Sequence, residues 1–219
     1  MKTLGLVVCV GLGAVACSDD SGVECGPGTV LENGQCVPDS SGPDAGSPAV
    51  DAADLPADAL RIFVTSTAYE RDLGGAAGAT ALCNAAAAAA SLAGSYIPWL
   101  SDDDSDALTR IVGEGPWYDT VDRLVFNNRA NLSTSPQRAI DRDEQANEIP
   151  IASSRRVWTG TAAGGGRDNV CSGNWFGLGT NGFVTVGSTS ATGGEWTDSE
   201  AIDCIAGGTT AHLYCLQQP

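Results

Sequence analysis

Basic groups are scarce in this sequence. Lys2 is the only lysine, His212 is the only histidine, and the formal net charge of the chain is -16. Binding of nucleic acid, of heparin-like glycans or of anionic lipid headgroups requires a basic surface patch. Because only Arg155 and Arg156 place two basic residues side by side, we expect no nucleic acid and no heparin-like polyanion among the partners.

The sequence also lacks motifs of the common catalytic and metal sites. It has no Gly-x-Ser-x-Gly, no His-Glu-x-x-His and no Cys-x-x-Cys, and its single histidine leaves few general bases. We therefore predict a protein that is not an enzyme and that needs no cofactor and no metal. The remaining catalytic alternative is a carboxylate pair such as Asp198 and Asp203, used as in a glycosidase.

The N-terminus, by contrast, carries an export signal. Lys2 precedes an apolar run over residues 4–12, and Ala14 to Cys17 form a small-residue cleavage site. The run is shorter than the about 20 apolar residues of a transmembrane helix, and the chain becomes polar at Ser18. Residues 1–16 are therefore predicted to be a cleaved lipoprotein signal peptide.

The cleavage site ends in a cysteine. Ala14-Val15-Ala16-Cys17 resembles the lipobox of bacterial lipoproteins, which implies that Cys17 is acylated and becomes the first residue of the mature chain. Several acyl chains would anchor the protein durably, because each buried methylene contributes about 0.8 kcal/mol. Ser18 resembles the outer-membrane sorting residue, so we expect a lipid-anchored protein of the cell envelope, in the outer membrane. The alternative is an ordinary signal peptide with an incidental cysteine.

Cysteine usage fits an oxidising compartment. Of the 8 cysteines, Cys9 leaves with the signal and Cys17 takes lipid. The rest form an even set that predicts three disulfides without fixing their pairing: Cys25, Cys36, Cys83, Cys171, Cys204 and Cys215. Turn signals between Cys25 and Cys36 predict a hairpin closed by its own disulfide within the lipid-anchored region 17–38.

The composition then changes twice. Residues 39–59 consist mainly of Ser, Gly, Pro, Asp and Ala with almost no large apolar side chain, so we predict a disordered linker. Alternating β-rich residues begin at Leu60, and the remaining residues, 60–219, suit one domain.

The first half of this domain favours helices. Residues 75–93 contain an alanine run, and Gly94 stands where a left-handed C-cap belongs. A second helix is expected after Ser101, with the acidic residues 102–104 at its positive end and a buried stripe formed by Leu108, Ile111 and Val112. Calcium binding by the acidic cluster is the alternative, although the glycine and the closing glutamate of an EF-hand loop are missing.

The second half favours short strands. They are expected at 156–159, 182–186 and 211–216, with glycine-rich loops at 162–167 and 187–194. The whole pattern predicts an α+β domain with two helices and short antiparallel strands.

Several of these segments resemble a known family. Val157 to Gly165, Trp175, Cys204 and Leu213 to Cys215 resemble the second half of endostatin, the collagen C-terminal fragment. Residues 61–65 resemble the opening strand of endostatin, residues 74–78 with Cys83 resemble its first helix, and residues 96–101 resemble the strand that follows. The chain is more similar still to a bacterial lipoprotein domain family of unknown function with this fold. The resemblance implies a C-type lectin-like domain over nearly all of residues 61–217.

The resemblance also implies a disulfide pattern, Cys83 to Cys215 with Cys171 to Cys204 nested inside it. Aromatic residues in short strands usually become buried, so Trp99, Trp158 and Trp175 are expected in the core. The lectins of this fold bind calcium and sugar through a Trp-Asn-Asp strand. Because Thr197 stands in place of the asparagine, between Trp196 and Asp198, we expect no calcium site of that type.

Glycines between Trp158 and Cys204 favour projecting loops, so we place the ligand surface there. Its expected members are Arg167, Asp168, Phe176, Asn181, Glu195 and Asp198. Asp198 matches the acidic position of the Trp-x-Asp strand, and its structural alternative is capping the turn at Ser199 and Glu200. By fold analogy the predicted function is a surface-displayed binding or adhesion lipoprotein with an unknown protein or glycan ligand. A structural envelope lipoprotein and a carboxylate-dependent envelope hydrolase are the alternatives.

Overall fold

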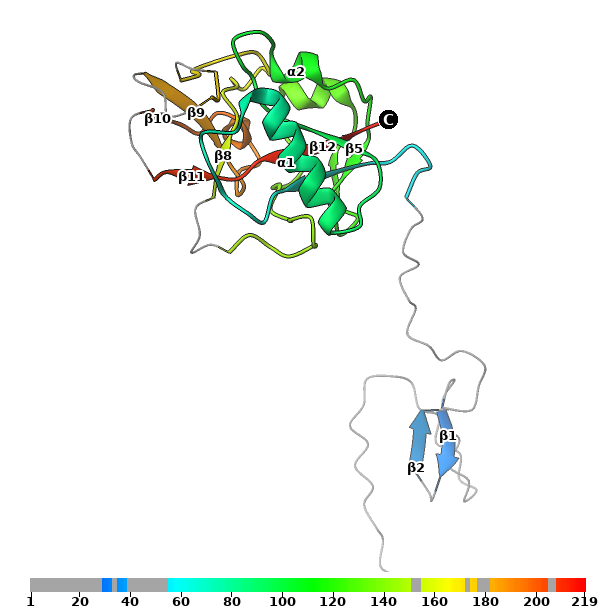
Figure 1. Ribbon diagram of the computed structural model, residues 1–219. Coiled ribbons are helices and arrows are strands. Elements are labelled where there is room, and N and C mark those ends of the chain that lie inside the picture. The colour runs from blue at the N-terminus through cyan, green and yellow to red at the C-terminus, as the bar shows by residue number, and fades with distance from the viewer. Residues whose placement is uncertain are drawn as a thin grey trace, which may run out of the picture. The chain divides into compact units, whose positions relative to one another are not determined.

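The computed structural model describes residues 29–32, 35–38, 55–150, 155–171, 174–176, 182–204 and 208–219 (Figure 1). The chain forms two units, Met1–Asp54 and Leu55–Pro219. The larger unit therefore begins at Leu55 rather than at the expected Leu60. Residues 57–59 line a groove together with residues 94–95 and 217–219 of the same unit.

The smaller unit contains a hairpin. Strands β1 (Thr29–Glu32) and β2 (Gln35–Pro38) pair antiparallel, with Glu32 opposite Gln35. The predicted hairpin is therefore present. The bridge predicted from Cys25 to Cys36, the lipid site at Cys17 and residues 39–54 of the linker lie outside what the structure describes.

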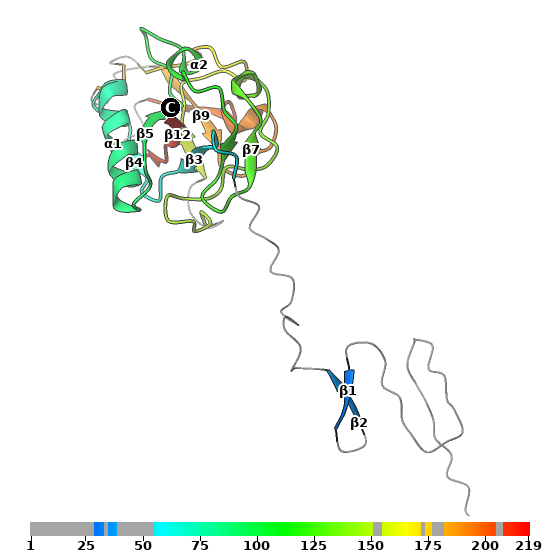
Figure 2. The same ribbon diagram turned by 90° about the vertical axis from the view of Figure 1, so that its right-hand side faces the viewer.

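The centre of the larger unit is a five-stranded sheet in the order β5-β12-β3-β6-β7. Its strands are β3 (Leu60–Val64), β5 (Ser95–Pro98), β6 (Trp117–Tyr118), β7 (Leu124–Phe126) and β12 (Tyr214–Gln218). Strands β3 and β6 run parallel, which the expectation of antiparallel strands did not include. Figure 2 shows that α1 (Gly75–Ala89) lies along one face of this sheet.

Both faces of the sheet are buried. On β3, Ile62 and Val64 belong to one hydrophobic cluster, whereas Phe63 belongs to another. On β12, Leu216 and Cys215 are divided in the same way. A strand covered on both sides has a continuous apolar sequence, because successive side chains point to opposite faces.

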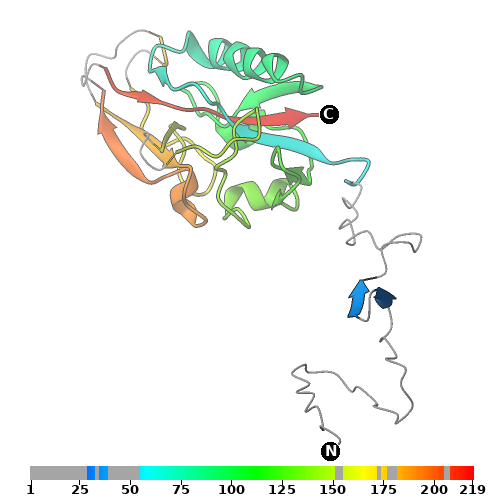
Figure 3. The ribbon, with the colours of Figure 1, turned by 90° about the horizontal axis from the view of Figure 1, so that it is seen from below.

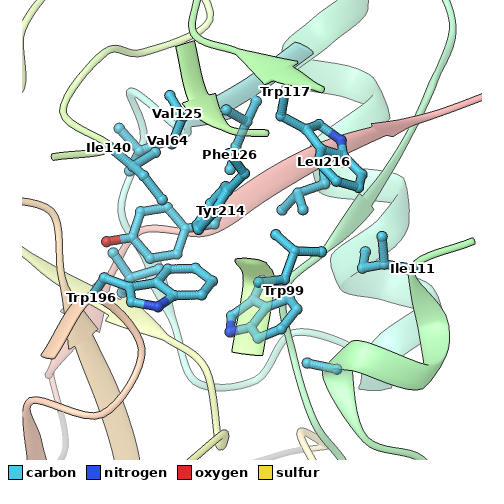
Figure 4. Packing of buried hydrophobic residues seen from close by; sticks show 14 of the residues in the cluster. Val64, Trp99, Ile111, Trp117, Val125, Phe126, Ile140, Trp196, Tyr214 and Leu216 are labelled. Atoms are coloured by element: carbon cyan, nitrogen blue, oxygen red, sulfur yellow. The ribbon is translucent and has the colours of Figure 1, made fainter. Parts of the chain in front are cut away.

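The cluster on the face away from α1 is rich in aromatic rings and is shown in Figure 4. Trp196 contacts Trp99, Phe126 and Tyr214, with ring centroids 4.9, 5.2 and 5.6 Å apart. The cluster beneath α1 contains Trp158 and Trp175, 6.1 Å apart. Trp99, Trp158 and Trp175 are all buried, as expected.

Helix α1 packs through small side chains. Its buried stripe is Gly75, Ala79, Cys83 and Ala87, at a spacing of four residues. Cys83 is bonded to Cys215 of β12, across 132 residues of sequence. In the chain-entropy view, such a long closed loop stabilises the fold by about 5 kcal/mol.

Helix α1 ends earlier than predicted. Ser91 has a left-handed φ of 59°, its N–H donates to Ala88, and the N–H of Leu92 donates to Ala87 at 2.9 Å. These bonds form a Schellman motif with serine, not Gly94, at the left-handed position. The side chain of Asn84 then bonds both backbone groups of Tyr96 at 2.9 Å, so that the helix covers the free edge of β5.

Helix α2 (Ala107–Arg110) is a single turn, so the prediction of a longer second helix was wrong. The acidic residues do not cap it. Asp102 instead accepts bonds from the N–H groups of Asp104 and Ser105 and pairs with Arg110. Among the three residues of the expected buried stripe, Leu108 is partly buried and Ile111 is buried, but Val112 is 66% exposed.

A second sheet has the order β10-β9-β8, with strands β8 (Arg156–Trp158), β9 (Phe183–Ser188) and β10 (Glu200–Asp203). Strand β9 continues through Gly187, which the sequence placed in a loop. A side chain there would lie 2.0 Å from the carbonyl oxygen of Trp196, so only glycine fits. The 3-10 helices are η1 (Arg129–Ser133) and η2 (Gly194–Trp196).

The predicted strand 211–216 is divided. Strand β11 (Thr210–Ala211) pairs with β4 (Tyr69–Glu70), and β12 begins only at Tyr214. Between them the backbone of His212 bonds Arg156 and Trp158 of β8 at 2.9 and 3.0 Å. The last segment therefore links the two sheets before it enters the central one.

Candidate functional site

Three loops meet on the surface of the larger unit, and we call them the loop cluster: residues 102–106, 162–168 and 193–198. The N–H of Arg167 donates to Asp106 at 2.7 Å, and its guanidinium pairs with Asp103 at 2.8 Å. The carboxylate of Asp198 accepts a hydrogen bond from the N–H of Ala163. These bonds hold the first and third loops against the second.

Buried hydroxyl groups support the loop cluster from below. Thr161 donates to the carbonyl of Thr159 at 2.6 Å, and Thr159 donates to the carbonyl of Thr197 at 2.6 Å. Ser101 lies 2.9 Å from the Thr161 hydroxyl and accepts from the N–H of Ala107. All four hydroxyl residues are fully buried, so each unmade bond would be costly.

Thr197 connects this network to the aromatic core. Its hydroxyl accepts a bond from Trp99 Nε1 at 2.7 Å and donates to the carbonyl of Thr161 at 3.2 Å. The side chain of Thr197 therefore points inward and stabilises the fold. This leaves Glu195 and Asp198, on either side of Trp196 and Thr197, as the exposed acids of the third loop.

Asp198 and Asp168 form the electrostatic centre of the loop cluster. Burial, and then the negative charge of Asp168, raise the pKa of Asp198 above its ordinary value, while the Ala163 N–H opposes the shift. Asp168 accepts a hydrogen bond from the hydroxyl of Thr185 at 2.6 Å. Asp168 is therefore held by strand β9 and Asp198 by the second loop.

The first loop borders an open acidic pocket of about 250 Å³ lined by residues 102–106, Thr109 and Arg167. Its carboxylates bond to the loop backbone, to Arg110 and to Arg167. In the parts of the chain that the structure describes, no group of three or more histidine, cysteine or acidic residues is arranged to hold a metal ion.

The structure gathers only part of the predicted ligand surface. Asp168 and Asp198 lie close together, with Glu195 in the same turn as Asp198. Arg167 also lies in the loop cluster but is engaged by Asp103. Phe176 is 62% exposed and lies instead against Gly75 at the start of α1. Asn181 lies outside the described residues.

Two more expectations concern Asp198. The carboxylate whose charge affects it is Asp168, whereas Asp203 lies in β10 opposite Phe183. The N–H of Ser199 donates to the carbonyl of Val186 at 2.8 Å and so does not need an aspartate cap. The structural role of Asp198 is therefore to hold the Ala163 loop, not to close the turn that follows it.

The bridge from Cys171 to Cys204, which the family resemblance implies, is present beside these loops. Sequence reasoning missed the buried hydroxyl network. Its only signal is the presence of Thr159, Thr161, Thr185 and Thr197 next to strand or tryptophan positions, and alternation alone does not reveal hydrogen-bond partners.

No protein family model matches the sequence, and no curated protein matches it. Across the described segments, no helix has the length and apolar character needed to cross a membrane.

Proposed function

We propose that this chain is a non-catalytic binding or adhesion lipoprotein displayed on the bacterial cell envelope, with a C-type lectin-like domain behind a lipid anchor at Cys17. The observation that carries the proposal is the loop cluster, in which exposed acids stand on a backbone fixed by buried hydroxyls. Loops that are already ordered lose less conformational entropy when they bind a partner. The loop cluster therefore suits recognition.

The chemistry of the loop cluster indicates what its ligand presents. Asp198 and Glu195 are exposed, and Asp168 adds negative charge beside Asp198. Carboxylates only accept hydrogen bonds when ionised, so the ligand must supply hydroxyl, amide or cationic donors. A glycan or a protein surface provides such donors, whereas a polyanion would be repelled.

The proposal is tested by capture from native envelope preparations with the full chain as bait. Joint replacement Glu195→Gln and Asp198→Asn should abolish capture and leave the melting temperature within about 2 °C, because the amide oxygen of the asparagine can still accept from the N–H of Ala163. The matched control is Glu70→Gln with Glu148→Gln, two exposed acids outside the loop cluster, and it should capture normally. Equal capture by both double variants would reject the site.

The anchor is tested separately. Cys17→Ser should move the protein from the membrane fraction to the soluble fraction, because serine lacks the thiol at which the lipobox resemblance places the lipid. Sedimentation of this variant with membranes after washes in high salt and carbonate would show that the anchor lies elsewhere.

Hydrolysis is the second candidate, and the pair Asp168 and Asp198 favours it. A carboxyl group of raised pKa beside a second carboxylate is the arrangement of acid and base in glycosidases. If purified chain releases reducing sugar from envelope polysaccharide, and Asp168→Asn and Asp198→Asn each abolish that release, the chain is a hydrolase. Binding without release supports the first proposal.

A further inference from the structure

A groove outside the loop cluster lies where the ends of the globular unit meet. Strand β12 runs antiparallel to both β3 and β5, which places its last residues beside the start of β3 and beside Ser95 (Figure 3). Gln218 also accepts bonds from the N–H groups of Val112 and Gly113 at 2.9 and 3.2 Å. The groove between these segments has a volume of about 720 Å³ and is lined by residues 57–60, 94–95, 112, 114–115 and 217–219.

The groove exposes an apolar surface. Val112 is 66% exposed, although the preceding Ile111 is fully buried. Ala57, Ala59 and Leu60 line the groove as well, with Leu60 also belonging to the core. A volume between about 300 and 1,000 Å³ is typical of small-molecule sites, so the groove is large enough for an organic ligand.

The charges of the groove have one sign. Asp58 and Glu114 line it and are exposed, and neither forms an ion pair within the described part of the chain. The described residues of the lining include no arginine, lysine or histidine. Arg61 of β3 pairs with Asp122 and donates to the carbonyl of Asp119. Arg129, whose backbone N–H donates to the carbonyl of Glu114, uses its guanidinium for the carbonyls of Leu108 and Ile111.

We propose that this groove binds a small organic cation with an apolar body, its ammonium or guanidinium group near Asp58 and Glu114 and its hydrocarbon part against Val112. Charge complementarity selects the cation, because two carboxylates without a counter-charge favour positive charge beside them. The apolar lining selects a hydrocarbon body, because covering Val112 removes apolar surface from water.

The test uses three probes with the same hydrocarbon chain on the full-length protein: hexylammonium, hexanoate and hexanol. Chemical shifts of the ¹⁵N-labelled protein are followed as each probe is added. Hexylammonium should bind most tightly and move the amide signals of Ser95, Val112 and Gln217. Equal binding of hexanoate would overturn the charge assignment, and shifts confined to other residues would overturn the site.

Two sets of variants separate the contributions. Val112→Lys places a cation inside the groove and should abolish hexylammonium binding, while Val121→Lys, the same change at another exposed valine, should not. Asp58→Asn with Glu114→Gln should weaken hexylammonium by about fivefold and leave hexanol unchanged, as expected for two exposed ion pairs. Glu70→Gln with Glu148→Gln, two exposed acids outside the groove and the loop cluster, is the matched control and should have no effect. Equal weakening by the control pair would overturn the proposal, because it would show a general effect of net charge.

Discussion

Thr197→Val tests the link between the aromatic core and the loop cluster. The two side chains have nearly the same shape, so the change leaves no cavity and removes only the hydroxyl. That hydroxyl accepts from Trp99 Nε1 at 2.7 Å and donates to the carbonyl of Thr161 at 3.2 Å, and Trp99 and Thr197 are fully buried. Without it the indole N–H has no acceptor in the core.

The expected cost follows from these two bonds. A buried donor left without a partner costs about 1–3 kcal/mol, and the weaker bond to Thr161 adds up to about 1 kcal/mol. We therefore expect the free energy of unfolding to fall by about 2–3 kcal/mol, which corresponds to roughly 5–10 °C in melting temperature for a domain of this size.

Urea unfolding monitored by tryptophan fluorescence measures this change. Thr192→Val, an exposed threonine of the same region, is the matched control and should change stability by less than about 0.5 kcal/mol. In a Trp99→Phe background the indole N–H is absent, so Thr197→Val should cost about 1–2 kcal/mol less than in the wild type. A cost below about 0.5 kcal/mol in the wild type would refute the proposed support of the loops.

Three further predictions concern buried groups. Burial raises the pKa of Tyr96 to about 12, so the stability that its protonated form contributes is complete below pH 10 and is lost as the pH rises toward 12. In a spectrophotometric titration this tyrosine should ionise last among those resolved, apart from Tyr214. Ionisation of Tyr96 near pH 10 in the folded state would contradict this prediction. Tyr96→Phe should leave the free energy of unfolding within about 0.5 kcal/mol, because the buried hydroxyl has no hydrogen-bond partner among the described residues. A loss above about 1 kcal/mol in urea unfolding would contradict this. Arg71→Met should raise the free energy of unfolding by about 1 kcal/mol, because the guanidinium is buried, burial lowers its pKa, and both terminal nitrogens lack a partner among the described residues. The same change at the exposed Arg138 should leave the free energy of unfolding unchanged. Destabilisation by Arg71→Met would show that the guanidinium has hydrogen-bond partners.

Local sequence signals predicted the parts of the fold that depend on neighbouring residues. The alanine run predicted α1, and the burial of Trp99, Trp158 and Trp175 followed from their aromatic character. The prediction placed the end of α1 too late because glycine is the residue most often found in the left-handed position after a helix, and the sequence offers Gly94 there. In the structure Ser91 takes the left-handed conformation that ends the helix. Leu92 can then pack against the cluster beneath the helix.

The other differences arise from contacts between distant segments. The aspartates at 102–104 have the composition of a helix start, but Asp102 is drawn to Arg110 and to its own loop backbone. The strand at 211–216 is interrupted because His212 pairs with β8. The charge of Asp168 raises the pKa of Asp198, two residues of the predicted ligand surface, but the sequence could not show that Phe176 lies against Gly75.

The loop cluster is proposed to recognise a component of the envelope. The most direct measurement is equilibrium binding of labelled Cys17→Ser chain, with and without Asp198→Asn, to isolated native envelopes. The asparagine retains an oxygen that can accept from Ala163 and loses only the charge, so the fold should be unchanged. We predict binding at least tenfold weaker, about 1.4 kcal/mol, at an unchanged melting temperature. Equal binding of the two proteins would contradict the account.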